Sequence, residues 1–519
     1  MDLLKDKIIH HRFILLLLLL YFFLHLLNLT TLPIFNDEAI YLDWGWAQTH
    51  VQGHLYDSLA DAKQPFLMWV FSFFVSIFTD PLFAGRFVSV LIGGVTLVGI
   101  YTLAKKLLTK NAALLAAGLY TIIPIIVFYN RQALMESAIA CIGIWSCNAL
   151  LNLLRKPTTK NGILLGCILG IGFFIKSSAL LFIMGSAIVV VVFLYKHKSM
   201  ELIRAYGISI LSAISVNILL LINPLFWQTL STNSRYTVTA GEFFSFPFVL
   251  WIHNILGFFE IGFFFITPFI FICSLFGIGL LLRAKNEQKN IFIVYFLIAF
   301  ILELFSTKSQ SQRYLLPFIP FLVIPASLIL SKLWRGNLLQ KLVVFVSFMV
   351  PCVLSFVLIC NPEQYIMQFS KVSHYSDTGY IQGQTAGYGI TEAMRYIKQH
   401  SAPNQPSLVF FALNVGNPEN AVSIYSQKDP RLVPLHIDAK LFSHLDQYNC
   451  LTSHYPSFIV TRNEQQMGLN HYLSFEKSFP NPDPNYSVKI YRFNKNCTGE
   501  TYVISDVYED LIKNALEMK

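Results

Sequence analysis

Apolar segments of about twenty residues recur through the first 360 residues of this chain, and no other feature restricts the fold as strongly. A helix of about 20 apolar residues crosses the hydrocarbon core of a bilayer and satisfies its own backbone hydrogen bonds there. The sequence therefore predicts a polytopic α-helical membrane protein. We expect eleven spans, near residues 13–32, 82–104, 111–129, 133–154, 161–175, 178–195, 205–223, 251–282, 290–306, 314–331 and 342–360. The first segment follows KDKIIHHR without a small-residue cleavage site, so we interpret it as an uncleaved anchor.

The distribution of basic residues predicts the orientation of these spans. With the N-terminus in the cytoplasm, six cytoplasmic segments carry three Lys or Arg each. The opposite side of the membrane region carries only seven: Lys63, Arg86, Arg131, Lys176, Arg235, Lys308 and Arg313. This asymmetry follows the positive-inside rule and predicts a cytoplasmic N-terminus with everything after residue 360 outside. It also accounts for the net charge of +9 without a nucleic-acid partner, in a chain with 55% hydrophobic and 13% charged residues.

The chain changes character after Cys360, where proline and asparagine become frequent. Strand-like runs (SLVFFAL, SFIVTR, YSVKIYRF) follow a helical stretch, ITEAMRYIKQH, and the chain ends in a second one, ISDVYEDLIKNALEMK. We expect a transmembrane domain at 1–360 and an extracytoplasmic α/β domain at 361–519. Cys450 and Cys497 would be able to pair in an oxidising compartment, and the sequence leaves this open.

Polar residues gather on the predicted outer side. The first outer loop contains DEAIYLDWGWAQTH and DAKQPFLMWVFSFFVSIF, and both pieces are amphipathic enough to lie as interfacial helices. Further charged residues fall at the outer ends of spans or inside them: Arg131, Glu136, Lys176, Glu260, Glu303, Lys308 and Arg313. Charged side chains are costly in a membrane unless they form ion pairs or take part in binding or catalysis. Their convergence on one side therefore predicts a site for an anionic, membrane-borne substrate.

Each of these residues also has a purely structural interpretation. Asn36 would cap the helix that follows it, with Asp37 and Glu38 favoured by the helix dipole. The others would be satisfied by lipid headgroups, by neighbouring helices or by an interfacial hydrogen bond: Lys63, Arg131, Glu136, His253, Glu260 and Glu303.

The order of the motifs favours the functional interpretation. NDEAIY follows the first span, and KQP lies in the first loop. R-x4-E lies at the start of the fourth span, IKS lies at the end of the fifth, and K-x4-RY-x2-P lies before the tenth. In this order they resemble the GT-C class of membrane glycosyltransferases, specifically the bacterial relatives of protein O-mannosyltransferases and the lipid A aminoarabinose transferase. The resemblance covers residues 13–360 and, more loosely, GQTAGYGITEAMRYIKQ.

The resemblance implies roles for particular residues. Asp37 matches the catalytic base, with Glu38 beside it, and Glu136 stands where relatives commonly have Asp. The residues that match the donor-phosphate site are Lys63, Arg131, Lys176, Lys308, Arg313 and Tyr314. In the aminoarabinose transferase a glutamate before the loop lysine helps to hold a metal, whereas here Ala62 takes that position and Asp61 precedes it. Asp61 and His253 are the candidate ligands for a divalent metal, whose presence is left open, and no other cofactor is expected.

The resemblance implies an inverting transfer of a sugar, hexose or pentose, from a polyprenyl-phosphate donor to a hydroxyl acceptor at the outer membrane face. A positioned carboxylate takes the acceptor's proton, and fixed cations stabilise the phosphate that leaves. The acceptor stays open among protein Ser/Thr, lipid A and other envelope glycans. The alternatives are a transporter or flippase for a lipid-linked anion, which would favour internal repeats that the sequence lacks, and a scaffold or receptor whose tail binds wall polymers.

Overall fold

The protein is a mostly helical membrane protein with a small sheet domain, as predicted. The computed structural model describes residues 2–401, 405–412, 416–437, 455–462 and 473–494. Over these ranges, seven helical segments are long and apolar enough to cross a membrane: α4 (Pro81–Leu107), α7 (Glu136–Arg155), α9 (Leu180–His197) with the short helix before it, α14 (Phe248–Ile261) with the π-helix after it, α16 (Glu287–Ser306), α18 (Ile319–Leu333) with the two short helices before it, and α19 (Leu338–Cys360). Shorter apolar helical segments are Arg12–Leu26 within α1 (Asp2–Leu26), and the helices α3 (Phe66–Ile77), α8 (Thr159–Ile175) and α15 (Pro268–Arg283). The predicted total of eleven spans stays a prediction.

Contacts along the chain define two compact units. Unit 1 contains residues 1–29, 53–70 and 86–377, and unit 2 contains residues 30–52, 71–85 and the chain from Thr378 onward. Most of the membrane helices therefore belong to unit 1, and the sheet belongs to unit 2. Residues 30–52, which belong to the predicted first outer loop, pack with the C-terminal part of the chain, and the sequence did not indicate this packing. The predicted domain boundary after residue 360 stays a prediction.

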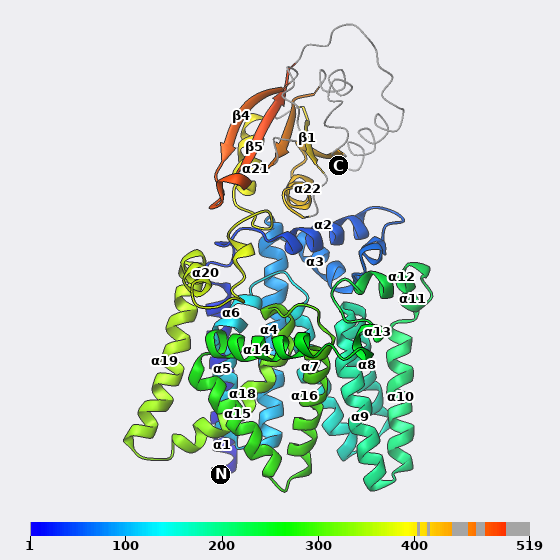
Figure 1. Cartoon of the computed structure of the whole chain (residues 1–519), viewed down its shortest axis with the longest axis vertical. Helices are drawn as coiled ribbons and strands as arrows, with labels where there is room; N and C mark the ends of the chain where they lie inside the picture. Colours follow the sequence, from blue (N-terminus) through cyan, green and yellow to red (C-terminus); the bar gives the residue numbers. More distant parts are fainter. Residues whose placement is uncertain (1, 402–404, 413–415, 438–454, 463–472, 495–519) are drawn as a thin grey trace. The chain divides into compact units, whose positions relative to one another are not determined.

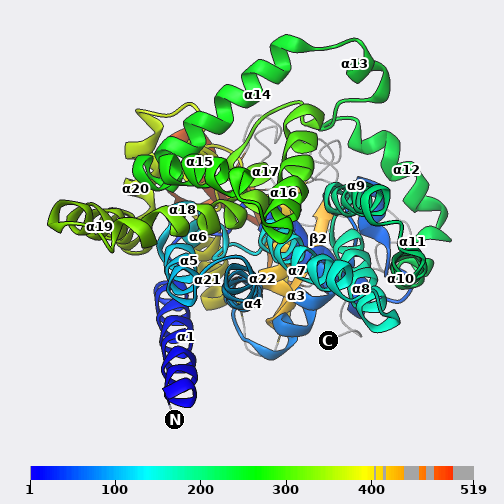
Figure 2. The ribbon, with the colours of Figure 1, turned by 90° about the horizontal axis from the view of Figure 1, so that it is seen from below.

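The expected span at 251–282 is wrong in one respect, because the chain forms two helices there. A short π-helix, Gly262–Ile266, follows α14, and Thr267 then takes φ 85° before α15 begins at Pro268. Proline lacks a backbone N–H and disfavours a helical conformation at the residue before it, so one continuous helix is excluded. Figures 1 and 2 show α14 lying across the bundle, whereas α15 and α16 run along it.

Other expected spans are also interrupted at identifiable residues. The segment 111–129 divides at Pro124 into α5 (Lys110–Ile122) and α6 (Pro124–Tyr129). The segment 205–223 divides at Asn217, between α10 (Met200–Val216) and α11 (Ile218–Leu221). The remaining short helices of unit 1 are η1 (Asp57–Asp61), η2 (Ser177–Ala179), α12 (Pro224–Asn233), α13 (Ala240–Phe244), α17 (Gln312–Leu315), η4 (Leu316–Phe318) and α20 (Pro362–Ser370).

Among the described residues, unit 2 contains a five-stranded mixed sheet with the order β2-β1-β3-β5-β4. The pairs β1–β2 and β1–β3 are parallel, and β3–β5 and β4–β5 are antiparallel. The strands are β1 (Ser407–Ala412), β2 (Leu432–Ile437), β3 (Ser457–Thr461), β4 (Leu473–Phe479) and β5 (Val488–Phe493). The three predicted runs became β1, β3 and β5, and β2 and β4 were not predicted.

Among the described residues, unit 2 also contains the α-helices α2 (Asn36–His50), α21 (Ile390–His400) and α22 (Glu419–Gln427) and the short 3₁₀ helices η5 (Thr378–Tyr380) and η8 (Pro484–Tyr486). α21 is the predicted helix ITEAMRYIKQH, and it contacts β4, β5 and α22. α22 contacts β1 and β2 and also packs against α2. The helix predicted at the C-terminal end, ISDVYEDLIKNALEMK, and both Cys450 and Cys497 lie outside the described residues.

Candidate functional site

A buried carboxylate at the start of α7 holds two basic side chains of unit 1. Glu136 is the first residue of α7 and is only 1% exposed. Its Oε1 accepts hydrogen bonds from Lys176 Nζ at 2.9 Å and from Arg313 NH2 at 3.2 Å. Lys176 follows the end of α8, and Arg313 lies in α17. A helix N-terminus favours a negative charge, so the position at the start of α7 helps to keep Glu136 ionised.

This Glu136–Lys176–Arg313 cluster carries one more positive than negative charge. Both cations remain partly exposed, with side-chain exposures of 24% for Lys176 and 16% for Arg313. The ammonium of Lys176 also lies over the ring of Tyr314, 5.6 Å from its centroid. Lys176 and Arg313 are therefore able to bind a second anion such as a phosphate. Their N–H donors are already oriented by Glu136, and they remain accessible for charge-assisted hydrogen bonds. The sequence predicted each of these residues individually, and the structure brings these four together.

A second ion-pair group of unit 1 surrounds Asp61, in the 3₁₀ helix η1 of the first loop. Its Oδ2 accepts from Lys63 Nζ, and its Oδ1 accepts from Arg235 NH2 at 2.7 Å. Burial raises the pKa of Asp61, but the hydrogen bonds from Lys63 and Arg235 outweigh it, so the pKa lies below its ordinary value. Arg235 was counted among the outer cations without a predicted role, and only the fold reveals that it shares a carboxylate with Lys63.

Arg131 donates to backbone carbonyls at the end of α1, and its predicted role in phosphate binding stays a prediction. Its guanidinium donates to the carbonyl oxygens of four residues at the end of α1, at 2.7–3.1 Å: Leu24, His25, Leu27 and Asn28. The terminal carbonyls of a helix lack intrahelical partners, and a cation there is favoured by the helix dipole. Arg86 donates to the next carbonyl, that of Leu29, at 2.9 Å.

Lys308 forms an exposed ion pair with Glu242. Its Nζ donates to Glu242 Oε1 at 2.9 Å, and both side chains are accessible to water. The backbone around it pairs with residues 236–238, since Lys308 N donates to Tyr236 O at 3.0 Å. The contact of Lys308 is therefore an exposed ion pair, and its predicted role in phosphate binding stays a prediction.

Unit 2 carries the predicted catalytic pair of the NDEAIY motif in the first turn of α2. Glu38 is fully buried, and its Oε2 accepts from the backbone N–H of Phe35 at 2.9 Å, which closes the start of the helix. Asp37 is half-buried. The expected cap at Asn36 is wrong, because the helix begins at Asn36 itself, and its side-chain oxygen accepts from Asn417 N at 3.0 Å.

The candidate metal ligands do not form a ligand set. Both carboxylate oxygens of Asp61 accept from cations, and His253 Nε2 lies 3.1 Å from the hydroxyl of Tyr375. No group of three or more His, Cys, Asp or Glu side chains is placed to hold a metal within the part of the chain that the structure describes. These residues do not fit a divalent metal, and no chemical step is assigned to one.

One buried hydroxyl near the cluster was not predicted. Tyr129, the last residue of α6, is fully buried, and its hydroxyl has no hydrogen-bond partner among the described residues. Asp377, Arg313 and Glu136 all act on this hydroxyl electrostatically. Tyr129 lies two residues before Arg131 in YNRQALME, and this proximity to a motif was the one sequence signal that pointed to it.

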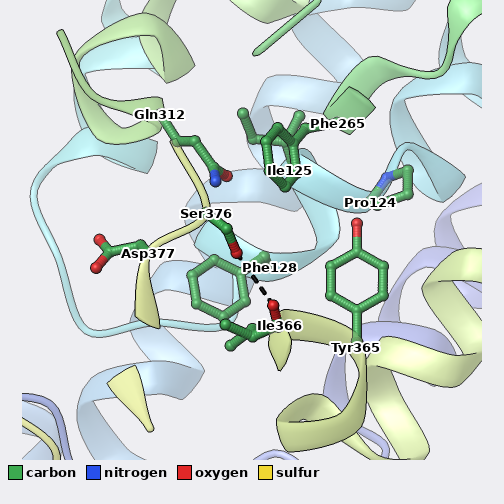
Figure 3. Close-up of a pocket in the computed structure, with 9 residues that line it drawn as sticks. All are labelled: Pro124, Ile125, Phe128, Phe265, Gln312, Tyr365, Ile366, Ser376 and Asp377. Carbon is green, nitrogen blue, oxygen red and sulfur yellow. Dashed lines mark hydrogen bonds between the residues drawn. The ribbon is translucent and has the colours of Figure 1, made fainter. Parts of the chain in front are cut away.

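A narrow cavity of unit 1 lies beside Gln312, the neighbour of Arg313. Its volume is about 20 Å³, and its lining atoms come mainly from α6, α20, Phe265 and residues 376–377. Figure 3 shows the Tyr365 hydroxyl pointing toward Pro124, and this hydroxyl has no hydrogen-bond partner among the residues described. Ser376 Oγ donates to Ile366 O at 3.1 Å across the cavity. The lining is mostly carbon, and the cavity is too narrow to hold a sugar.

The helical bundle and the sheet domain together have the fold of the membrane protein ArnT, as comparison with solved structures shows. A family model described as dolichyl-phosphate-mannose-protein mannosyltransferase matches residues 62–227, which include Lys63, Glu136 and Lys176. This match supports the predicted relationship to protein O-mannosyltransferases. No curated protein matches the sequence.

The solved structures cover nearly the whole chain at low identity. ArnT from Cupriavidus metallidurans in the apo state aligns with a TM-score of 0.58 and 14% identity, over 96% of this chain and 99% of ArnT. The same protein bound to undecaprenyl phosphate aligns with a TM-score of 0.55 and 15% identity, over 94% and 98%. The archaeal oligosaccharyltransferase AglB from Archaeoglobus fulgidus, in complex with an inhibitory peptide and a dolichol-phosphate, aligns with a TM-score of 0.50 and 11% identity, over 88% and 69%.

Proposed function

We propose that this protein is an inverting glycosyltransferase that moves a hexosyl or pentosyl group from a polyprenyl-phosphate donor to a hydroxyl acceptor. The observation that carries the proposal is the Glu136–Lys176–Arg313 cluster, in which a buried carboxylate orients two accessible cations that the motifs assign to the donor phosphate. The relatives support it, since solved structures of similar fold contain undecaprenyl phosphate and dolichol-phosphate.

The cations of unit 1 serve the leaving group. In the donor the phosphate is a diester with one negative charge, and it gains a second charge when the bond to the sugar breaks. Lys176 and Arg313 stabilise that growing charge because their donors are already oriented by Glu136 before the reaction begins. Lys63 and Arg235 have the same capacity, with Asp61 as the carboxylate that orients them.

Asp37 serves the nucleophile. An acceptor hydroxyl is a weak nucleophile, and a carboxylate that accepts its proton as the new bond forms lowers the barrier. The sugar then passes from the phosphate oxygen to the acceptor oxygen in one displacement, the proton goes to Asp37, and the configuration at the anomeric carbon inverts. One base is sufficient, because no covalent sugar–enzyme intermediate forms.

We place this reaction at the extracytoplasmic face of a cell membrane, with the N-terminus in the cytoplasm. The three-cation pattern of the cytoplasmic segments supports this orientation. The substrates are then a lipid-linked sugar within the bilayer and an acceptor that is a protein, a glycolipid or another envelope glycan.

The experiment that tests the proposal incubates detergent-purified protein with a polyprenyl-phosphate sugar labelled in both the lipid and the sugar. A glycosyltransferase releases polyprenyl phosphate and transfers the sugar label to an acceptor in a membrane extract. A transporter or flippase would leave the donor intact and would move it between leaflets of a proteoliposome. An intact donor in the presence of extract, with Lys176 and Arg313 unaltered, would contradict the proposal.

A further inference from the structure

The helix that carries Asp37 is held by the C-terminal part of the chain through a buried carboxylate, Asp43. Asp43 lies in the middle of α2 and is 7% exposed. Its Oδ2 accepts from Asn420 Nδ2 at 2.8 Å, and its Oδ1 accepts from Gln427 Nε2 at 3.2 Å. Asn420 and Gln427 lie near the two ends of α22, so both carboxylate oxygens connect α2 to one helix of the sheet domain.

A second set of contacts holds the start of α2, on either side of Asp37. Asn36 N donates to Thr385 O at 3.0 Å, and Asn36 Oδ1 accepts from Asn417 N at 3.0 Å. Asn417 Nδ2 in turn donates to Thr385 O at 2.9 Å. Gly416 has φ +99°, and a Cβ there would lie 1.9 Å from the side-chain oxygen of Asn36. Only glycine permits this close approach, so the loop before α22 is built against the start of α2.

Asp37 lies on a different face of α2 from Asp43 and its contacts with α22, as the geometry of a helix shows. Asp37 and Asp43 are six residues apart, which is about 9 Å along the axis and about a third of a turn around it. The face of α2 that bears Asp43 is therefore occupied by α22, and Asp37 belongs to a different face. Since a helix of fifteen residues moves as one body, fixing Asp43 and Asn36 fixes the direction of Asp37.

We propose that Asp43 is a positioning residue for sugar transfer, and that α22 with its preceding loop, Gly416–Gln427, sets the orientation of α2 and hence of Asp37. The inference rests on the proposed function, because it gives the C-terminal domain a task in that same reaction. Asp43 does not touch the substrate. It acts through Asp37.

A structural role alone would explain why Asp43 is buried, but it predicts different results. If Asp43 only supported folding, its loss would lower the amount of folded enzyme, and the molecules that still fold would keep the wild-type kcat. Loss of a positioning contact lowers the rate of the chemical step while the donor still binds, because the donor phosphate is assigned to cations of unit 1. A misplacement of about 1 Å at a reacting group can reduce the rate about 100-fold.

The test compares kcat, donor affinity and Tm for Asp43→Ala, Asp43→Asn and the exchange variant Asp43→Asn/Asn420→Asp in detergent-purified full-length protein. The exchange keeps one carboxylate and one amide at the contact with their positions reversed. The matched control is Asp429→Asn, which removes a buried carboxylate of the same unit that pairs with Arg431. We expect kcat to fall about 10- to 100-fold in Asp43→Ala, donor affinity to stay within about twofold, and the exchange to recover at least a third of the wild-type kcat. Asp429→Asn should keep kcat.

A double variant separates this inference from the proposed function. If Asp43 acts through Asp37, Asp37→Asn/Asp43→Ala should be no slower than Asp37→Asn alone, because effects of groups that act as a unit are not additive. The inference would be overturned if the double variant were slower than Asp37→Asn by the full factor that Asp43→Ala loses alone. An unchanged kcat in Asp43→Ala would also overturn it. So would an exchange variant that has the wild-type Tm but is as slow as Asp43→Ala. Full transfer by Asp37→Asn would instead contradict the base assigned in the proposed function.

Discussion

Replacing Glu136 with Gln should tighten donor binding, although it removes an ion pair from the structure. Glu136 Oε1 accepts from both Lys176 and Arg313. Glutamine has nearly the same shape and keeps an acceptor oxygen, so the two cations stay close to their positions. What changes is the charge. A phosphate that binds the same two cations would lie about 5–6 Å from the carboxylate, which is two charge-assisted hydrogen-bond lengths.

The size of the effect follows from that separation. Two like charges about 6 Å apart repel by about 3 kcal/mol at an effective dielectric constant of about 20. Because Lys176 and Arg313 are partly exposed, solvent reduces this value, and we expect donor affinity to rise by about 1–2 kcal/mol, or about 5- to 30-fold. The ligand-free protein should lose stability at the same time, by about 2–4 kcal/mol, since two partly buried cations lose their counter-ion.

The assay is thermal unfolding of the detergent-purified protein over a titration of the donor, a polyprenyl-phosphate sugar. Ligand that binds the folded state raises Tm in proportion to its affinity and concentration, so Glu136→Gln should begin with a lower Tm and show a larger ligand-induced increase. Glu260→Gln is the control, because Glu260 accepts from Ser373 and His374 and has no role in the proposed site. A Glu136→Gln protein with weaker donor binding than wild type would refute the reasoning, since the carboxylate would then assist binding rather than compete with the phosphate.

Four further outcomes are expected. Asp37→Asn should reduce sugar transfer by about 10²–10⁴-fold with donor binding retained, measured by parallel transfer and binding assays, because the amide cannot accept a proton. Lys63→Ala and Arg313→Ala should each weaken polyprenyl-phosphate affinity by about 1–3 kcal/mol, the size of a charged hydrogen bond, and unchanged affinity in both would assign these cations to lipid headgroups. Burial raises the pKa of Asp43 to about 6 from an ordinary 3.8, so its contribution to the free energy of unfolding is fully present below pH 3.8 and is lost as pH rises through 6. The Tm of wild type relative to Asp43→Asn should therefore fall between about pH 4 and pH 7, by the equivalent of about 3 kcal/mol. Finally, cysteines introduced at 332–341 should react with an impermeant reagent only from the cytoplasmic side, and labelling from outside would overturn the orientation.

The membrane helices were predictable because their signal is local. Twenty consecutive apolar residues identify a span without reference to any other part of the chain. The interruptions at Pro124 and Pro268 were equally visible in the sequence, but hydropathy averages over them. In the sheet domain, β1, β3 and β5 were found from their β-branched and aromatic runs. β2 contains Pro434, and β4 alternates polar and apolar residues around a register shift, so neither has the apolar run of a buried strand.

The pairing of charges was not predictable from one sequence. Glu136 and Lys176 are 40 residues apart, and Glu136 and Arg313 are 177 apart, so only the fold shows that they share one oxygen. The contacts of Arg131 were not predictable either. Arg131 lies in a motif at the predicted outer end of a span, and its guanidinium donates to the carbonyls of Leu27 and Asn28, just after the end of α1. The carbonyls at a helix end need hydrogen-bond donors from elsewhere in the fold, and a sequence motif does not show which cation supplies them.

The two acids of the NDEAIY motif illustrate how a structural and a catalytic interpretation can both apply to one short stretch. Glu38 is fully buried and bonded to Phe35 N, so its carboxylate closes the start of α2, as a residue in the first turn of a helix commonly does. That contact gives Glu38 a structural task and narrows the proposed base to Asp37. Asn36, on the other side of Asp37, is bonded to the loop before α22. Asp37 therefore lies between two residues that anchor α2, which is the arrangement that a carboxylate with a directed chemical task requires, since a base must be held still to be effective.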